Sequence, residues 1–167
     1  LVFTLTDADG DQAEFTHVLT VNPPDVPKVI VDANISTNTT WTKDKIYELA
    51  TRVTVLSGVT LTIQPGTIIK GQPGTGSNAT ALLVARGGKL IADGTASEPI
   101  IFTTTSDQIV PGLIKSPNLS PTLNGQWGGV IILGNAPISA SSSGNQLTEV
   151  QIEGIPTSDP NGLYGGN

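Results

Sequence analysis

The segment Gly58-Val-Thr-Leu-Thr-Ile-Gln-Pro-Gly-Thr67 returns later in the chain as Gly87-Gly-Lys-Leu-Ile-Ala-Asp-Gly-Thr95. The two copies align when one residue, Pro65, is skipped. Each copy is preceded by one short apolar run and followed by another; these runs occupy residues 53–56 and 68–69 around the first copy, and residues 82–84 and 100–102 around the second. The repeat is decisive because short apolar runs alone would also suit an antiparallel sandwich.

Three short strands that return after roughly 29 residues are typical of a solenoid in which each coil packs on the next. Small turn residues let the backbone change direction, and aliphatic residues stack from coil to coil. We therefore predict an all-β fold, a right-handed parallel β-helix over residues 28–167. Leu61 is expected to stack near Leu90 on the following coil, with residues 61–63 parallel to residues 90–92.

The composition favours many short strands joined by turns. Hydrophobic residues make up 37% of the chain and aromatic residues 4%, with 19 glycines and 12 prolines. Such a composition argues against long amphipathic helices. The net charge of −6 argues against a nucleic-acid or anionic-membrane partner, because both require clustered Lys and Arg.

Several function classes are excluded by residue types that the chain lacks. With no cysteine, the sequence can form no disulfide framework, thiolate zinc site or cysteine nucleophile. No apolar run approaches the roughly 20 residues of a transmembrane helix, so no membrane insertion is predicted. Leu1 opens directly on strand-like alternation without a signal peptide, and we expect the chain to be a segment of a longer protein.

Residues 1–22 read as a β-hairpin, with strands at residues 2–6 and 13–21 and Asp-Ala-Asp-Gly-Asp supplying the turn between them. An isolated hairpin is marginally stable in water, so we expect this one to end a β-sandwich domain whose other strands precede it. Residues 23–27 contain three prolines and predict a stiff linker.

Two resemblances extend this interpretation. Residues 1–22 resemble the closing hairpin of bacterial cadherin-like and Ig-like surface repeats. Residues 30–167 resemble a family of secreted or cell-surface β-helix proteins common in Bacteroidota-type bacteria. The motifs that carry the second resemblance are Leu-Thr-Ile-Gln-Pro-Gly-Thr-Ile-Ile-Lys-Gly at 61–71, Leu-Ile-Ala-Asp-Gly-Thr at 90–95, Pro-Ile-Ile-Phe-Thr at 99–103, Trp-Gly-Gly-Val-Ile-Ile-Leu-Gly-Asn-Ala-Pro at 127–137 and Gln-Ile-Glu-Gly-Ile-Pro-Thr-Ser-Asp-Pro-Asn-Gly-Leu-Tyr-Gly at 151–165. What it implies is the fold and an extracellular location, without an established chemistry.

Asp7, Asp9 and Asp11 form the strongest metal signal. Carboxylates at alternate positions around a glycine imitate the first half of a calcium-binding EF-hand loop. The twelfth position counted from Asp7 is Val18, so the bidentate glutamate is missing and a true EF-hand is excluded. The competing interpretation is a hairpin turn that uses Asp and Gly for their backbone preferences.

A dinucleotide site and a catalytic triad are both disfavoured. Residues 74–79 match G-x-G-x-x-A, and Asp93 follows, but a strand-like run comes next where the nucleotide would need a helix. His17 is the only histidine and lies on the hairpin, so residues 28–167 cannot build a Ser–His–Asp arrangement.

Carboxylate catalysis also finds little support. Glu149 and Glu153 are expected on the outward face of one strand, about 13 Å apart, which exceeds the roughly 6.5–9.5 Å of inverting glycosidase pairs. Lys70 and Arg86 end apolar runs, where a charge at a coil corner is the ordinary outcome. Trp41 and Trp127 are predicted to cap an end of the solenoid or pack beneath a loop, rather than stack on sugar rings.

We therefore predict a non-catalytic structural or adhesive segment, a rigid rod with recognition loops at residues 72–80 and 107–125. The alternative is a polysaccharide-active enzyme or carbohydrate-binding module completed by residues outside this chain. The expected partners are other domains or subunits of a surface assembly, with polysaccharide as a further candidate. The last coil would expose strand edges, so more chain or a partner is expected to cover it.

Overall fold

The computed structural model describes residues 2–16 and 25–166. In the first of these parts, β1 (Val2–Thr6) and β2 (Gln12–Thr16) pair antiparallel, from Val2 opposite Thr16 to Thr6 opposite Gln12. The predicted hairpin is therefore present, although residues 17–21 of its expected second strand lie outside the described residues. Among the described residues there is no helix of the length and hydropathy needed to cross a membrane.

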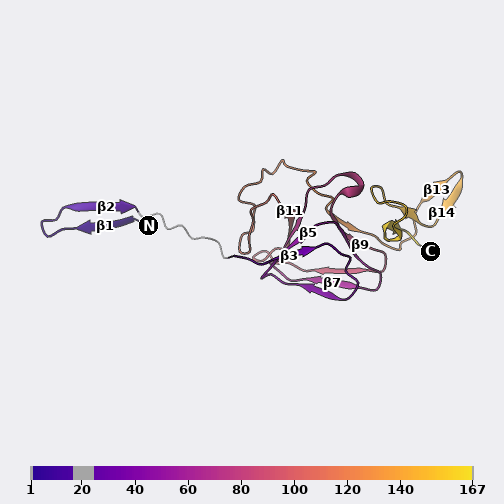
Figure 1. Cartoon of the computed structure of the whole chain (residues 1–167), viewed down its shortest axis with the longest axis horizontal. Coiled ribbons are helices and arrows are strands. Elements are labelled where there is room, and N and C mark those ends of the chain that lie inside the picture. The colour runs from indigo at the N-terminus through magenta and orange to yellow at the C-terminus, as the bar shows by residue number, and fades with distance from the viewer. Residues whose placement is uncertain (1, 17–24, 167) are drawn as a thin grey trace.

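Three parallel sheets form the body of the protein (Figure 1). The first sheet has the order β11-β8-β5-β3, the second β12-β9-β6 and the third β10-β7-β4. The chain visits the sheets in turn. The strand bounds are β3 (Lys28–Val31), β4 (Thr39–Trp41), β5 (Ile46–Leu49), β6 (Arg52–Val55), β7 (Thr60–Ile63), β8 (Ile68–Gly71), β9 (Ala81–Val84), β10 (Lys89–Ala92), β11 (Ile101–Thr104) and β12 (Val130–Ile132).

The register confirms the predicted right-handed parallel β-helix. Leu61 pairs with Leu90 in parallel strands of the third sheet, as the repeat required. In the first sheet Ile46 lies beside Ile68, which in turn lies beside Ile101. The coils lengthen along the chain because the connections between strands grow while the strands keep three or four residues.

The core is a set of aliphatic rows inside the three sheets. Side chains alternate between the two faces of a strand, so every second residue points inward. Leu49, Val53, Val55, Leu61 and Leu82 are completely buried in one cluster. Each such side chain stabilises the fold by about 1.5–3 kcal/mol relative to exposure.

The two tryptophans pack into or against this core. Trp41 is buried on the first coil and stacks on Tyr47 with ring centroids 4.7 Å apart. The Tyr47 hydroxyl accepts a hydrogen bond from the Thr42 backbone N–H at 2.9 Å. Trp127 is half-buried against the same core and lies over Gly71, where any side chain would collide with the indole.

The outer faces of two sheets are also covered. On the first sheet, Ile46 and Ile68 pack under Ile109, which belongs to the long connection between β11 and β12. On the second sheet, Leu83 packs against Leu133 and Ile155 from the C-terminal segment, which we define as residues 133–166. The predicted recognition loop at residues 107–125 is therefore anchored at its start and exposed along most of its length.

The C-terminal segment leaves the solenoid after β12. Its elements are β13 (Ala140–Ser142), β14 (Asn145–Leu147), β15 (Val150–Gln151), a 3-10 turn (Pro160–Gly162) and β16 (Leu163–Tyr164). The pairs β13–β14 and β15–β16 are antiparallel, whereas the sequence prediction extended the parallel coils to residue 167. A local turn explains the first pair, because Ser143 and Gly144 both have positive φ and form a two-residue hairpin loop.

Candidate functional site

An open polar groove of about 490 Å³ crosses successive coils at the corner between the first and second sheets. It collects short segments from four parts of the chain that are far apart in sequence. The lining residues are Asp32, Ala33, Asn34, Ala50, Thr51, Arg52, Thr54, Ser77, Asn78, Ala79 and Asp159. We call this feature the corner groove.

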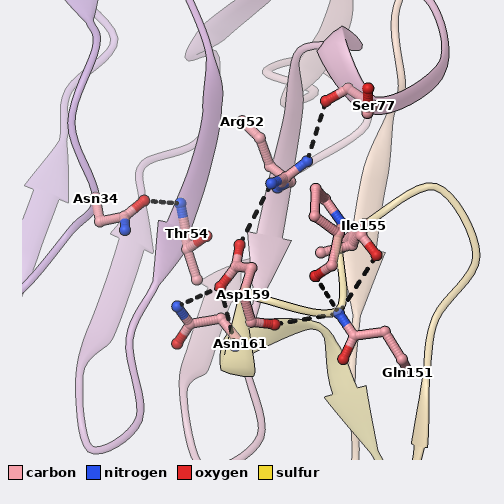
Figure 2. A network of polar contacts seen from close by, with 9 residues as sticks. Asn34, Arg52, Thr54, Ser77, Gln151, Ile155, Asp159 and Asn161 are labelled. Carbon is pink, nitrogen blue, oxygen red and sulfur yellow. Dashed lines mark hydrogen bonds and ion pairs between the residues drawn. The ribbon is translucent and has the colours of Figure 1, made fainter.

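Arg52, at the start of β6, lines the corner groove, and Figure 2 shows it in contact with Asp159 and Ser77. Its Nη2 is 3.3 Å from Asp159 Oδ2, and its Nη1 donates to the Ser77 carbonyl at 3.4 Å. The side chains of Arg52 and Asp159 are 18% and 24% exposed. Together with the Ser77 carbonyl, this half-buried pair joins three segments of the chain: β6, the loop before β9 and the C-terminal segment.

Asp159 is itself held on the side away from Arg52. Its Oδ1 accepts hydrogen bonds from the Asn161 backbone N–H at 3.1 Å and from Asn161 Nδ2 at 2.9 Å. The backbone carbonyls of Pro156 and Asp159 accept from Gln151 Nε2 at 3.0 and 3.1 Å (Figure 2). The carboxylate is therefore a fixed acceptor for Arg52 and leaves the groove with a rigid polar edge.

Two asparagines complete strand ladders on the first coil. Asn34 Oδ1 accepts from the Thr54 N–H at 3.0 Å, and Asn38 Oδ1 accepts from the Thr60 N–H at 2.9 Å. Here a side-chain amide replaces the backbone carbonyl of a neighbouring strand, which keeps the backbone donors of β6 and β7 satisfied. Asn34 also lines the corner groove.

A second polar cluster fastens the long connection to the first sheet. Lys70, in β8, is only 5% exposed, and its Nζ donates to the backbone carbonyls of Asp107 at 2.7 Å and Ile109 at 2.9 Å. The Asp107 carboxylate accepts from Thr103 Oγ1, from the Ile109 N–H and from Ser116 Oγ, at 2.7–2.9 Å. Lys70 is therefore not an ordinary charge at a coil corner: it lies within β8 and is buried, because the loop covers the face on which it points outward.

Burial lowers the pKa of the Lys70 ammonium below its ordinary value, and this effect exceeds the opposing attraction of Asp107. The ammonium nevertheless has two carbonyl acceptors, which lie within the loop that buries it. Through these contacts Lys70 anchors the loop to the first sheet and is not presented to a ligand.

Arg86, like Arg52 and Lys70, connects the solenoid to a distant segment of the chain, here the C-terminal segment. Its Nη1 donates to the Gly165 carbonyl at 2.6 Å, and its Nη2 lies 2.8 Å from Glu149 Oε2. The predicted shared strand of Glu149 and Glu153 is wrong, because β15 spans only Val150–Gln151 and Glu153 follows in a turn. The structure thus gives Glu149 a cation as its partner and leaves Glu153 exposed.

Asp7, Asp9 and Asp11 lie in the turn of the β1–β2 hairpin. Asp7 Oδ1 accepts from the backbone N–H groups of Asp9 at 3.0 Å and Asp11 at 2.9 Å. The turn therefore uses Asp7 to satisfy its own backbone, and no group of three candidate ligands is gathered for a metal ion anywhere in the described residues. The calcium hypothesis stays a prediction.

The remaining sequence candidates are separated in space. Residues 74–79 form a loop with a 3-10 turn (Gly76–Asn78) that leads into strand β9, so the dinucleotide interpretation lacks its helix. Asp93 is exposed just after β10, and His17 lies outside the described residues. The structure brings none of these residues to the corner groove except Ser77, Asn78 and Ala79.

Sequence reasoning missed the partners of the three cations. The two residues of the Arg52–Asp159 pair are separated by 107 positions. A usable signal was present at Lys70, since a single cation within the apolar run Ile-Ile-Lys-Gly suggests a strand covered on its outer face.

Comparison with known proteins identifies a family. Residues 33–164 match the family model described as a pectate-lyase like beta helix domain. No curated protein and no solved structure matches the chain.

Proposed function

Since the chain belongs to the family of pectate-lyase-like beta helix domains, we propose that it is a structural or adhesive module of a secreted or cell-surface protein. It would act as a stiff, exposed rod without catalytic activity of its own. A fold of this kind is compatible with several functions, so the proposal depends on the side chains on the outside of the solenoid.

The observation that carries the proposal is that the cations on the outside of the solenoid make their contacts within the protein. Arg52, Lys70 and Arg86 each hold a long connection or the C-terminal segment against the outside of a sheet. General acid–base catalysis requires titratable groups that can reach a substrate. Cations whose contacts are made within the protein instead stiffen the wall, as a scaffold requires.

The sheets supply the stiffness along the rod. Each coil is joined to the next by backbone ladders in three sheets, so stability is expected to add coil by coil. The polar corner groove and the exposed part of residues 107–125 would then provide the surface that meets a partner.

The test is a binding and turnover screen of the chain against acidic and neutral polysaccharides. We expect no release of new chain ends, and retention on a particular polysaccharide would favour an adhesive role. Turnover that is lost in an Arg52→Ala, Arg86→Ala or Asp93→Asn variant, but kept in an Asp44→Asn control, would overturn the proposal.

The corner groove favours a second candidate function, polysaccharide binding. Its lining includes Asp32 and Asn78, whose planar polar groups are of the kind that pair with sugar hydroxyls. Under this alternative, Asp32→Asn and Asn78→Ala would weaken retention on the polysaccharide, whereas Glu153→Gln, outside the groove, would leave it unchanged. Equal retention by all three variants would place binding elsewhere.

Calcium binding by Asp7, Asp9 and Asp11 remains a separate proposal. The ion would stiffen the hairpin turn before the proline-rich stretch, with carboxylate oxygens as its ligands. Calorimetric titration of a protein that contains the whole preceding domain should show calcium-dependent heat, and chelation should lower its melting temperature. Neither effect should survive in an Asp9→Asn/Asp11→Asn variant, and their absence from the original protein would refute the proposal.

A further inference from the structure

The ionisable side chains of the corner groove leave it with a net negative charge. Among the described residues that line it, two are carboxylates, Asp32 and Asp159, and one is a cation, Arg52. The whole chain is acidic as well, with a net charge of −6 at pH 7. A polymer of uronic acids carries a carboxylate on every sugar, and proteins hold carboxylates with cations, above all with arginine. The charge of the lining is therefore a guide to the class of polysaccharide that fits the groove.

Arg52 is the cation of the groove, and its guanidinium is already engaged. Its Nη2 lies 3.3 Å from Asp159 Oδ2 and its Nη1 donates to the Ser77 carbonyl at 3.4 Å, so the guanidinium points at acceptors of the protein itself (Figure 2). Asp159 is held in turn by two hydrogen bonds from Asn161. A uronate would have to displace this fixed carboxylate to reach Arg52, and exchanging one carboxylate for another gains little free energy.

Asp32 presents a negative charge to the groove. It follows β3 directly and is exposed, so its carboxylate is accessible to a ligand. An ionised carboxylate only accepts hydrogen bonds. It therefore pairs with the hydroxyl groups of a neutral sugar and repels the carboxylates of a polyuronate. Asn78, exposed on the loop before β9, adds an amide that both donates and accepts.

A calcium ion that bridged Asp32 to a sugar carboxylate would remove this repulsion. Ca²⁺ takes about 6–8 oxygen ligands, so a bridge of this kind needs several ligands from the protein. The described residues contain no group of three Asp, Glu, His or Cys side chains placed to hold a metal ion, and Asp159 is engaged with Arg52. The lining therefore does not favour a polyuronate held through calcium.

Small side chains follow the groove from coil to coil. Ala33 comes shortly after β3, Ala50 lies between β5 and β6, and Ala79 precedes β9, so three successive coils each place a methyl group in the lining. Neighbouring strands of a sheet are about 4.8 Å apart, which is close to the length of a sugar unit in an extended glycan. A lining repeated from coil to coil in this way suits consecutive sugars of one chain.

We propose that the corner groove binds an uncharged, linear polysaccharide along the solenoid and rejects polyuronates. The proposal rests on the polysaccharide-binding function considered above for this groove, and it names the class of ligand. Asp32 and Asn78 hydrogen-bond to sugar hydroxyls, and the alanines let the C–H faces of the sugars approach the backbone. The Arg52–Asp159 pair stays intact when the ligand binds.

Affinity electrophoresis of the full chain tests this preference, in gels that contain hydroxyethylcellulose, glucomannan or polygalacturonate, with a polysaccharide-free gel as the reference. We expect retardation by a neutral polysaccharide and none by polygalacturonate, with or without added calcium. Asp32→Lys gives the lining a net positive charge, so polygalacturonate should retard this variant, and its affinity for the neutral polysaccharide should fall about fivefold. The control Glu153→Lys makes the same change of charge at an exposed residue outside the groove and should alter neither result.

The outcomes separate the ligand class from polysaccharide binding itself. Retardation of the original protein by polygalacturonate overturns the proposed class and leaves polysaccharide binding in place, and so does an Asp32→Lys variant that polygalacturonate fails to retard. Neutral binding that Asp32→Lys and Asn78→Ala both leave unchanged overturns the proposal, because the ligand then lies outside the corner groove. No retardation by any of the three polysaccharides refutes both the ligand class and the binding function. An unchanged melting temperature shows that each exposed substitution leaves the fold intact.

Discussion

Replacing Lys70 with methionine removes a buried ammonium without removing the aliphatic stem that fills the same space. Lys70 is 5% exposed, and its Nζ donates to the carbonyls of Asp107 and Ile109 at 2.7 and 2.9 Å. The variant leaves both carbonyls without this donor beneath the long connection. We expect the connection to loosen from the first sheet and the protein to lose stability.

The magnitude follows from the two hydrogen bonds. A hydrogen bond to a charged group contributes about 1.5–3 kcal/mol net in mutational series. Because burial disfavours the charged ammonium, as the lowered pKa of Lys70 shows, the lower end of this range applies to each bond. The free energy of unfolding should fall by about 3 kcal/mol in Lys70→Met. The control Lys28→Met removes a lysine that is 61% exposed and paired with Glu48. It should change the free energy of unfolding by less than about 1 kcal/mol.

The pH dependence of stability provides an independent arm of the same test. In the unfolded chain Lys70 titrates near its ordinary pKa of 10.5, and in the folded protein its pKa is lower. Between these two values the unfolded chain binds more protons, so the free energy of unfolding rises with pH. Below the folded-state pKa the penalty for burying the charge is fully present. The stability difference between the original protein and Lys70→Met should therefore grow as the pH rises toward 10.5.

Urea unfolding measures the free energies, and hydrogen exchange locates the change. We expect faster exchange at the Ile109 N–H, which donates to the Asp107 carboxylate in the fastened loop. If Lys70→Met unfolds at the same urea concentration as Lys28→Met, with unchanged exchange at Ile109, then the fastening role assigned to Lys70 is wrong.

Three further predictions concern the wall and the core. Gly71→Ala should lower the free energy of unfolding by about 1–3 kcal/mol, because its Cβ would collide with the Trp127 indole; Gly134→Ala, with open space around it, should change urea unfolding little. Arg52→Ala should speed hydrogen exchange in the C-terminal segment while the parallel sheets stay protected, and unchanged exchange there would contradict the role of its ion pair. Leu61→Ala should cost about 2–5 kcal/mol, since the side chain is completely buried, and a smaller loss in urea would mean that the core collapses around the cavity.

The repeat predicted the part of the fold that local patterns control. Leu61 and Leu90 occupy equivalent places in two copies of one motif, and they pair as the alignment required. Alternating apolar residues fix which face of a strand is buried, and a glycine with positive φ, such as Gly58 or Gly87, fixes where the chain turns. These signals lie within a few residues of one another, so the sequence displays them directly.

The C-terminal segment shows where the patterns stop being sufficient. Val150 and Ile152 alternate as in the strands of the solenoid, and they lie within residues 28–167, for which the sequence predicted a parallel β-helix throughout. The structure pairs Val150 with Tyr164 in an antiparallel strand and packs Ile152 on the outside of the second sheet. The outer face of that sheet also carries apolar residues, Leu83 and Ile131, so alternation alone does not decide which face a later strand covers.

The sequence by itself determined the solenoid, the strand register of its repeat and the absence of cysteine chemistry. Only the tertiary structure decided the use of the charges. Lys70 is buried and anchors the long connection, and Arg52 pairs with Asp159, 107 positions away in sequence, at the corner groove. Backbone periodicity is a local property that each segment carries alone. The environment of a charged side chain depends on every segment that packs around it. That environment is formed only when the long connections have packed against the sheets.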